Sequence, residues 1–213
     1  MLLSVNCFSQ HLIEKSINSG AEQIILEFNA INQIQLFNSE GDPDFLILAE
    51  GKTHLPMFVI KEVNGVVYVE ENEIRADKET DGLDKVCIVE PDFTSYQVYV
   101  PRGKDVYVSF IEGNLYAEGF RGNLNIIVEN GIIKLNHIND SVKVRLNSGS
   151  IYVENLENAF VDAETSLGSL IIDPSLEGFS EGEKHLVENL GNASKKLLIK
   201  TILANVYLNV SED

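Results

Sequence analysis

The sequence predicts an all-β protein: a right-handed, β-helix-like solenoid with repeats of about 18 residues, preceded by a looser β-rich section. The first observation is a series of glycines, Gly113, Gly131, Gly149 and Gly168, separated by 18, 18 and 19 residues. The second is that apolar residues recur at fixed positions on both sides of each glycine. A repeat of this length, with apolar and polar residues alternating, is typical of stacked strands that together bury one face.

The apolar positions keep one phase across the repeats, and Ala204 marks a fifth equivalent position. Strict alternation predicts a strand before and a strand after each glycine, with a polar corner between repeats. An antiparallel meander or sandwich with evenly spaced hairpins would produce similar alternation, but the constant phase favours the solenoid. The first column, seven residues before each marker, is Val106, Leu124, Val142, Val161 and Leu197, and the column two residues after it is Leu115, Ile133, Ile151, Leu170 and Val206.

We expect one β-solenoid domain over residues 11–213, following a short leader at residues 1–10. Within it, residues 21–100 form the looser β section, and Asn64-Gly65 between two apolar runs predicts a two-residue hairpin. The regular repeats span residues 101–172. Residues 173–194 break the pattern, and the final strands fall within residues 195–210.

The first ten residues resemble the end of a secretory signal peptide, because a short apolar stretch is followed by small and polar residues. On this interpretation the leader is removed and the protein is exported to the periplasm or the cell surface. If these residues are not a signal remnant, a cytoplasmic location is expected instead.

Composition excludes several classes of protein. The chain has 213 residues, 16 Lys and Arg against 33 Asp and Glu, and a formal net charge of −17, which disfavours binding to nucleic acid or to anionic lipid. The apolar fraction of 44% is too high for a disordered chain. Two cysteines are too few for a disulfide-dense scaffold or a four-cysteine zinc site.

The segment Val98-Tyr-Val-Pro-Arg-Gly103, followed by turns such as Asn130-Gly-Ile-Ile and Ser148-Gly-Ser-Ile, carries a family resemblance. The chain resembles the bacterial putative-adhesin β-solenoid domains of the GIN, or auto-transporter adhesin head-like, type. The resemblance covers roughly residues 21–210. It implies an exported, envelope-associated solenoid without established catalytic residues.

No motif for a nucleophile, a phosphate loop or a dinucleotide site is present, so we expect no cofactor, no resident metal and no enzymatic activity. Two acidic features of the sequence favour other functions. Asp162 and Glu164 face outward from one predicted strand, as the carboxylates of a glycan-active β-helix enzyme would. The turns with Asp42 and Asp44 and with Asp77 and Asp81 offer oxygen ligands to calcium.

The candidate binding residues are Tyr116, Tyr152 and Tyr207, which share one outward column three residues after the repeat marker. Such a row of tyrosines can contact sugar rings or a protein partner, or it can serve only cross-strand packing. The sequence thus predicts a non-enzymatic, adhesin-like structural or binding module of the bacterial cell envelope, with a glycan or an envelope protein as partner. A cytoplasmic self-assembling scaffold and the glycan-active enzyme are the alternatives, and no feature indicates the oligomeric state.

Overall fold

The computed structural model describes residues 11–17, 20–40, 45–51, 57–72, 94–172 and 182–210. These residues form fifteen strands and no helix, and therefore no helix that is long and apolar enough to cross a membrane. The strands are β1 (His11–Ile17), β2 (Gln23–Glu27), β3 (Ala30–Asn38), β4 (Phe45–Gly51), β5 (Met57–Val63), β6 (Val66–Asn72), β7 (Ser95–Val100), β8 (Asp105–Glu118), β9 (Leu124–Asn136), β10 (Val142–Leu156), β11 (Ala159–Thr165), β12 (Leu170–Ile172), β13 (His185–Asn189), β14 (Lys195–Thr201) and β15 (Asn205–Val210).

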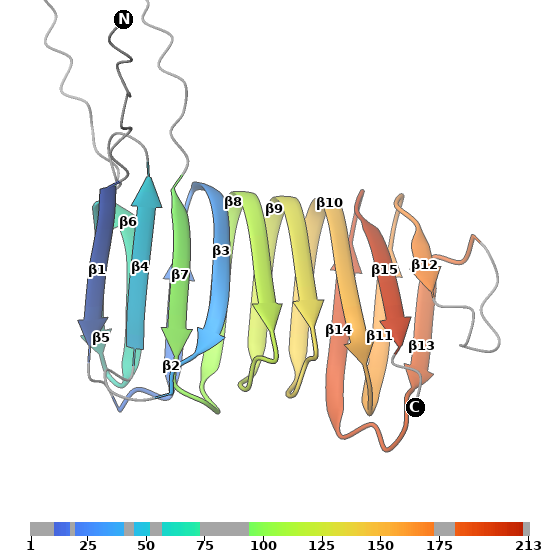
Figure 1. Ribbon diagram of the computed structural model, residues 1–213. Coiled ribbons are helices and arrows are strands. Elements are labelled where there is room, and N and C mark those ends of the chain that lie inside the picture. Colours follow the sequence, from blue (N-terminus) through green and yellow to red (C-terminus); the bar gives the residue numbers. More distant parts are fainter. Residues whose placement is uncertain are drawn as a thin grey trace, which may run out of the picture.

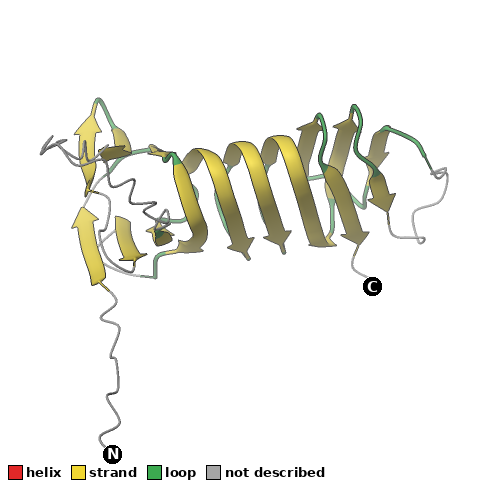
Figure 2. Ribbon diagram, turned by 90° about the horizontal axis from the view of Figure 1, so that it is seen from above, coloured by secondary structure: helices red, strands yellow, loops and turns green. Residues whose placement is uncertain are grey.

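All fifteen strands belong to one mixed sheet that folds over into two layers (Figure 1 and Figure 2). The long strands β8, β9 and β10 bend and run through both layers. Their first halves join the layer ordered β5-β6-β2-β8-β9-β10-β14-β11-β13, called here the first layer. Their second halves join the layer ordered β1-β4-β7-β3-β8-β9-β10-β15-β12, the second layer, which faces the viewer in Figure 1.

The prediction of a regular right-handed β-solenoid is wrong. The sheet mixes parallel pairs with the antiparallel pairs β1-β4, β4-β7, β5-β6 and β11-β13. The 18-residue repeat stacks in sequence order only across β8, β9 and β10, because β14 and β15 lie between β10 and the pair β11 and β12. Leu197 of β14 pairs with both Val142 and Val161. The residues of the predicted apolar column are therefore neighbours in the sheet, but their order across the sheet differs from their order in the sequence. Alternation specifies which face of a strand is buried and leaves open which strand lies beside it.

Gly113, Gly131 and Gly149 lie inside β8, β9 and β10, where the sequence predicted turns between separate strands, whereas Gly168 lies between β11 and β12. At Gly149 the backbone has φ +125°, and a Cβ atom added there would lie 1.9 Å from the carbonyl oxygen of Gly131. Glycine is required because only a residue without Cβ allows successive bends to stack this closely. The bend also resets the alternation, so that Phe110 and Leu115 on either side of Gly113 both point into the core.

The core lies between the two layers. Val144 in the first layer and Ile151 in the second have no exposed surface, and Ile151 belongs to the predicted apolar column two residues after each repeat marker. Each corner between repeats also carries one buried apolar residue, and these residues, Phe120, Ile138 and Leu156, close the core at the corners. The predicted hairpin at Asn64-Gly65 connects β5 and β6.

Candidate functional site

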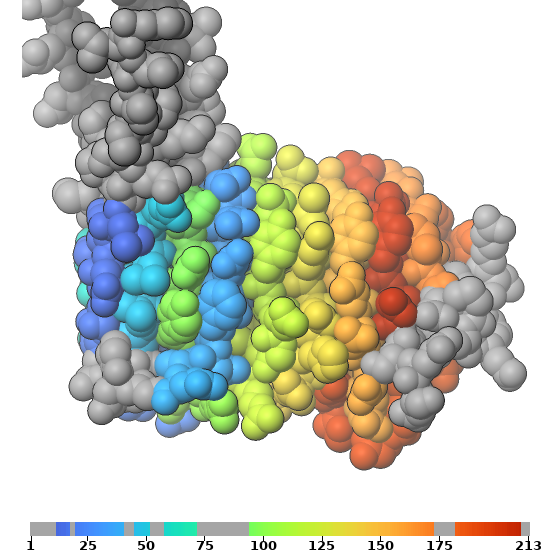
Figure 3. All heavy atoms as spheres, viewed as in Figure 1, coloured from blue at the N-terminus to red at the C-terminus, as the bar shows by residue number. Residues whose placement is uncertain are grey.

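The tyrosines of the candidate site lie in one row on the outer face of the second layer. In-register pairing places Tyr116 of β8 beside Lys134 of β9, then Tyr152 of β10, Tyr207 of β15 and Ile171 of β12. Each of these side chains points outward because the residues before and after it in its strand point into the core. We call these five residues the aromatic row. It runs across the face that is turned to the viewer in Figure 3.

The aromatic rings of the row pack against their neighbours along the sheet. The rings of Tyr152 and Tyr207 stack with centroids 4.6 Å apart and an interplanar angle of 6°. The ammonium group of Lys134 lies 5.7 Å from the ring centroids of both Tyr116 and Tyr152, within the range of a cation–π contact. These contacts occupy both faces of the Tyr152 ring, so the aromatic row stabilises the packing of side chains between neighbouring strands.

One end of the aromatic row remains open. A shallow groove of about 330 Å³ lies beside Tyr207 and is lined also by Tyr152, Ile171, Glu154 and Asn209. Tyr207 has Tyr152 on one side and Ile171 on the other, and Ile171 is 43% exposed. Neither phenol oxygen of Tyr152 or Tyr207 makes a hydrogen bond to a described residue. The groove thus offers apolar surface, two phenol hydroxyls and one carboxylate.

The acidic pair Asp162 and Glu164 faces outward from β11, as the sequence predicted. Asp162 Oδ1 lies 2.9 Å from His185 Nε2, and Glu164 Oε2 lies 3.6 Å from Lys200 Nζ. Each carboxylate therefore has its own basic partner, and neither lines the groove beside Tyr207. This arrangement gives no support to the glycan-active enzyme.

The calcium candidates Asp42, Asp44, Asp77 and Asp81 lie outside the described residues. Within the residues that are described, no group of three or more His, Cys, Asp or Glu side chains is placed to hold a metal ion.

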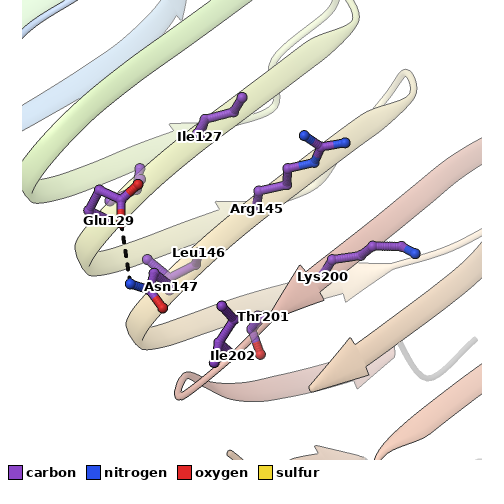
Figure 4. A pocket seen from close by; sticks show the side chains of 9 residues that line it. Ile127, Glu129, Arg145, Leu146, Asn147, Lys200, Thr201 and Ile202 are labelled. Atoms are coloured by element: carbon purple, nitrogen blue, oxygen red, sulfur yellow. Dashed lines mark hydrogen bonds between the residues drawn. The ribbon is translucent and has the colours of Figure 1, made fainter. Parts of the chain in front are cut away.

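A second groove, on the outer face of the first layer, was missed by the sequence reasoning. It has a volume of about 350 Å³ and is lined by side chains of β9, β10 and β14, among them Arg145 and Lys200 (Figure 4). The signal was present in the sequence: basic residues alternate with buried ones in Val142-Lys-Val-Arg-Leu146 of β10, and Lys196 and Lys200 take outward positions in β14. Only the pairing of β10 with β14 brings the two sets together.

Comparison with known proteins identifies the fold. No protein-family model matches this sequence, and no curated protein matches it. The crystal structure of a "putative cell adhesion protein" from Clostridium sporogenes ATCC 15579 has a TM-score of 0.65 to this chain, with 12% identity over 95% of this chain and 100% of that one.

More distant matches include a "putative adhesin" from Bacteroides fragilis NCTC 9343, with 11% identity over 94% of this chain and 98% of that chain and a TM-score of 0.39. A "putative lipid binding protein" from Parabacteroides distasonis ATCC 8503 has 13% identity over 95% of this chain and 97% of that chain and a TM-score of 0.34. At 12% identity the likeness to the clostridial protein concerns the fold alone. The chain shares the fold of the clostridial protein.

Proposed function

We propose that this protein is a non-enzymatic, adhesin-like binding module of the bacterial cell envelope, related to the putative-adhesin families, and that it binds its partner at the open end of the aromatic row. The fold shared with a protein named for cell adhesion supports the general class. The observation that carries the binding surface is the groove beside Tyr207, where a stacked aromatic pair meets an exposed isoleucine.

The groove fits the less polar face of a sugar ring. Tyr152 covers one face of the Tyr207 ring, and the other face is turned toward Ile171, which is 43% exposed, so Tyr207 and Ile171 together present apolar surface in the groove. Around it, the phenol hydroxyls and the Glu154 carboxylate can exchange hydrogen bonds with ligand hydroxyl groups. A neutral glycan supplies both kinds of surface. A protein loop that presents an aromatic residue is the other partner that this chemistry allows.

The test is a screen of the full chain on an array of neutral glycans, followed by the same screen with Tyr207→Ala and Tyr152→Ala. Tyr207→Ala removes the receiving surface itself, and we expect binding to the glycans recognised by the wild type to fall about tenfold or more. Tyr152→Ala removes the ring that holds Tyr207 in place, so we expect a smaller loss. Melting temperatures measured in parallel separate binding from folding.

Tyr107→Ala is the matched control. Tyr107 also points outward from β8, but its half of the strand lies in the first layer, beside Ile25 and Asn125. Its replacement is expected to leave glycan binding unchanged. If the wild type binds no glycan on the array, or if Tyr107→Ala lowers binding as much as Tyr207→Ala, the proposed surface is wrong.

The envelope location has a separate test, which is amino-terminal sequencing of the native protein from fractionated cells. We expect a chain that begins near Gln10 or His11 in the envelope fraction. A chain that keeps Met1 in the cytosol would overturn the proposed location and favour the scaffold alternative.

A further inference from the structure

The first layer carries a cluster of basic side chains on the face opposite the aromatic row. Lys143 and Arg145 point outward from β10, and Lys196 and Lys200 point outward from the neighbouring strand β14. All four are exposed, and Arg145 lies directly beside Lys200 in the register of the two strands. We call these four residues the basic patch. The chain has 16 Lys and Arg residues against 33 Asp and Glu residues, so four basic side chains on two neighbouring strands are not expected from its composition.

Little of this charge is neutralised within the described structure. Lys200 forms an ion pair with Glu164 at 3.6 Å. The side chains of Lys143, Arg145 and Lys196 make no hydrogen bond and no ion pair with any described residue. Like charges on adjacent strands destabilise a sheet, although each exposed pair costs little. The positive charge is therefore available to an external anion.

The basic patch borders the groove on β9, β10 and β14. Arg145 and Lys200 extend in the same direction from neighbouring strands, and Ile127 and Ile202 add apolar surface (Figure 4). In the same groove, Asn147 Nδ2 donates a hydrogen bond to Glu129 Oε2 at 3.2 Å. The groove thus combines two cations, two exposed or half-exposed aliphatic side chains and an amide–carboxylate pair.

This combination indicates the chemistry of a ligand. Arg145 can bind a carboxylate through two parallel hydrogen bonds, and Lys200 adds a second positive charge. Glu129 would repel an isolated anion, whereas it accepts hydrogen bonds from hydroxyl groups, as does the oxygen of Asn147. A ligand that carries carboxylates together with many hydroxyls satisfies both sets of groups. We propose that this groove binds a carboxylate-bearing polysaccharide.

This proposal is independent of the aromatic row, because the two surfaces lie on opposite layers. The test uses polygalacturonate as the probe and isothermal titration calorimetry of the full chain at low salt. We expect saturable binding that weakens as salt is added, since the basic patch is exposed. The double variant Arg145→Gln/Lys200→Gln removes both positive charges and keeps a polar side chain at each position, and we expect it to bind about tenfold more weakly.

The matched control is Arg102→Gln/Lys61→Gln, which makes the same charge change at exposed ion pairs far from β14. It should bind polygalacturonate like the wild type, and so should Tyr207→Ala, which separates this proposal from the proposed function. Fully methyl-esterified polygalacturonate, which is neutral, should not bind.

The proposal is overturned if the wild type does not bind polygalacturonate, if the esterified polymer binds equally well, or if the control variant shows an equal loss. Inorganic polyphosphate, which has no hydroxyl-rich backbone, serves as a competitor. Displacement of polygalacturonate by polyphosphate at equal charge concentration would show that the groove selects anionic charge alone, which contradicts the assignment to a polysaccharide.

Discussion

The three repeated strands β8, β9 and β10 and the amino-terminal strands β1 to β7 build the same two layers by different means. In the repeats, residues 18 apart pair in parallel along nearly the whole strand, from Val106 and Leu124 to Glu118 and Asn136. The amino-terminal part combines antiparallel pairs with parallel pairs between distant segments, such as β3 with β7. Its core is also more aromatic, since Tyr96 stacks on Phe28 at 4.4 Å and meets Phe58 edge-on at 6.1 Å.

The difference shows that the strands of one sheet can be held together either by repeated contacts or by contacts that occur once. In the repeats, like residues stack on like residues, and the same backbone bend recurs at each glycine, so that a change at one position strains its neighbours on both sides. In the amino-terminal part, each contact is made once, so a change is felt locally. Substitutions of the same kind in the two regions therefore provide a direct test.

The largest effect is expected from a charge in the stacked core. Val144 has no exposed surface and lies between the columns of β9 and β14, so Val144→Asp buries a carboxylate without a partner and should cost about 5 kcal/mol of unfolding free energy. Val63→Asp is the counterpart in β5, where the side chain is 50% exposed, and should cost less than about 1 kcal/mol. Urea denaturation measures both. Equal midpoints for the two variants would show that the assigned register is wrong.

The second effect concerns the bends. Gly149→Ala places Cβ 1.9 Å from the carbonyl oxygen of Gly131, so the stacked backbones must separate, and we expect a loss of about 3 kcal/mol. Gly65→Ala in the β5-β6 hairpin also has a positive φ, +76°, but no atom lies within 4 Å of the added Cβ, and about 1 kcal/mol is expected. Thermal unfolding of both variants measures the difference. A smaller loss at Gly149 than at Gly65 would contradict the role of the close backbone approach.

The smallest effect is a pH dependence of stability that arises from Tyr96 in the aromatic core of the amino-terminal part. Burial, together with the negative charge of Glu71 2.7 Å from the phenol oxygen, holds the pKa of Tyr96 well above its usual range. The folded protein therefore keeps this proton while the unfolded chain loses it above pH 10. The stability contributed by the raised pKa is complete below that pH and decreases as the pH rises further, by about 1 kcal/mol per unit at first.

Tyr96→Phe should remove this decrease, at the expense of about 1 kcal/mol at neutral pH for the lost hydrogen bond. Urea midpoints of the wild type and the variant between pH 8 and pH 11 measure the effect. The expected result is a flatter profile for the variant above pH 10; parallel profiles would mean that Tyr96 ionises in the folded state.

The sequence predicted the row of tyrosines in the candidate site and did not predict the groove beside it. The column of Tyr116, Tyr152 and Tyr207 follows from the repeat, because residues in one phase of paired parallel strands are neighbours. The groove beside Tyr207 does not, since it depends on β12 lying beside β15 and ending there. The same holds for the basic patch, whose two halves are at least 51 residues apart in the sequence, the separation of Arg145 and Lys196, and meet only through the pairing of β10 with β14.

By itself, the sequence determined the all-β class, the buried face of each strand and the constant spacing of the repeats. These follow from the alternation of apolar and polar residues and from the positions of glycine, which act locally along the chain. The tertiary structure alone decided which strands are neighbours. It placed the carboxyl-terminal strands β14 and β15 beside β10, and it joined the amino-terminal strands to the same sheet through antiparallel pairs. The physical reason is that backbone hydrogen bonds are the same for every pair of strands, so the choice of partner depends on how all side chains fill the shared core.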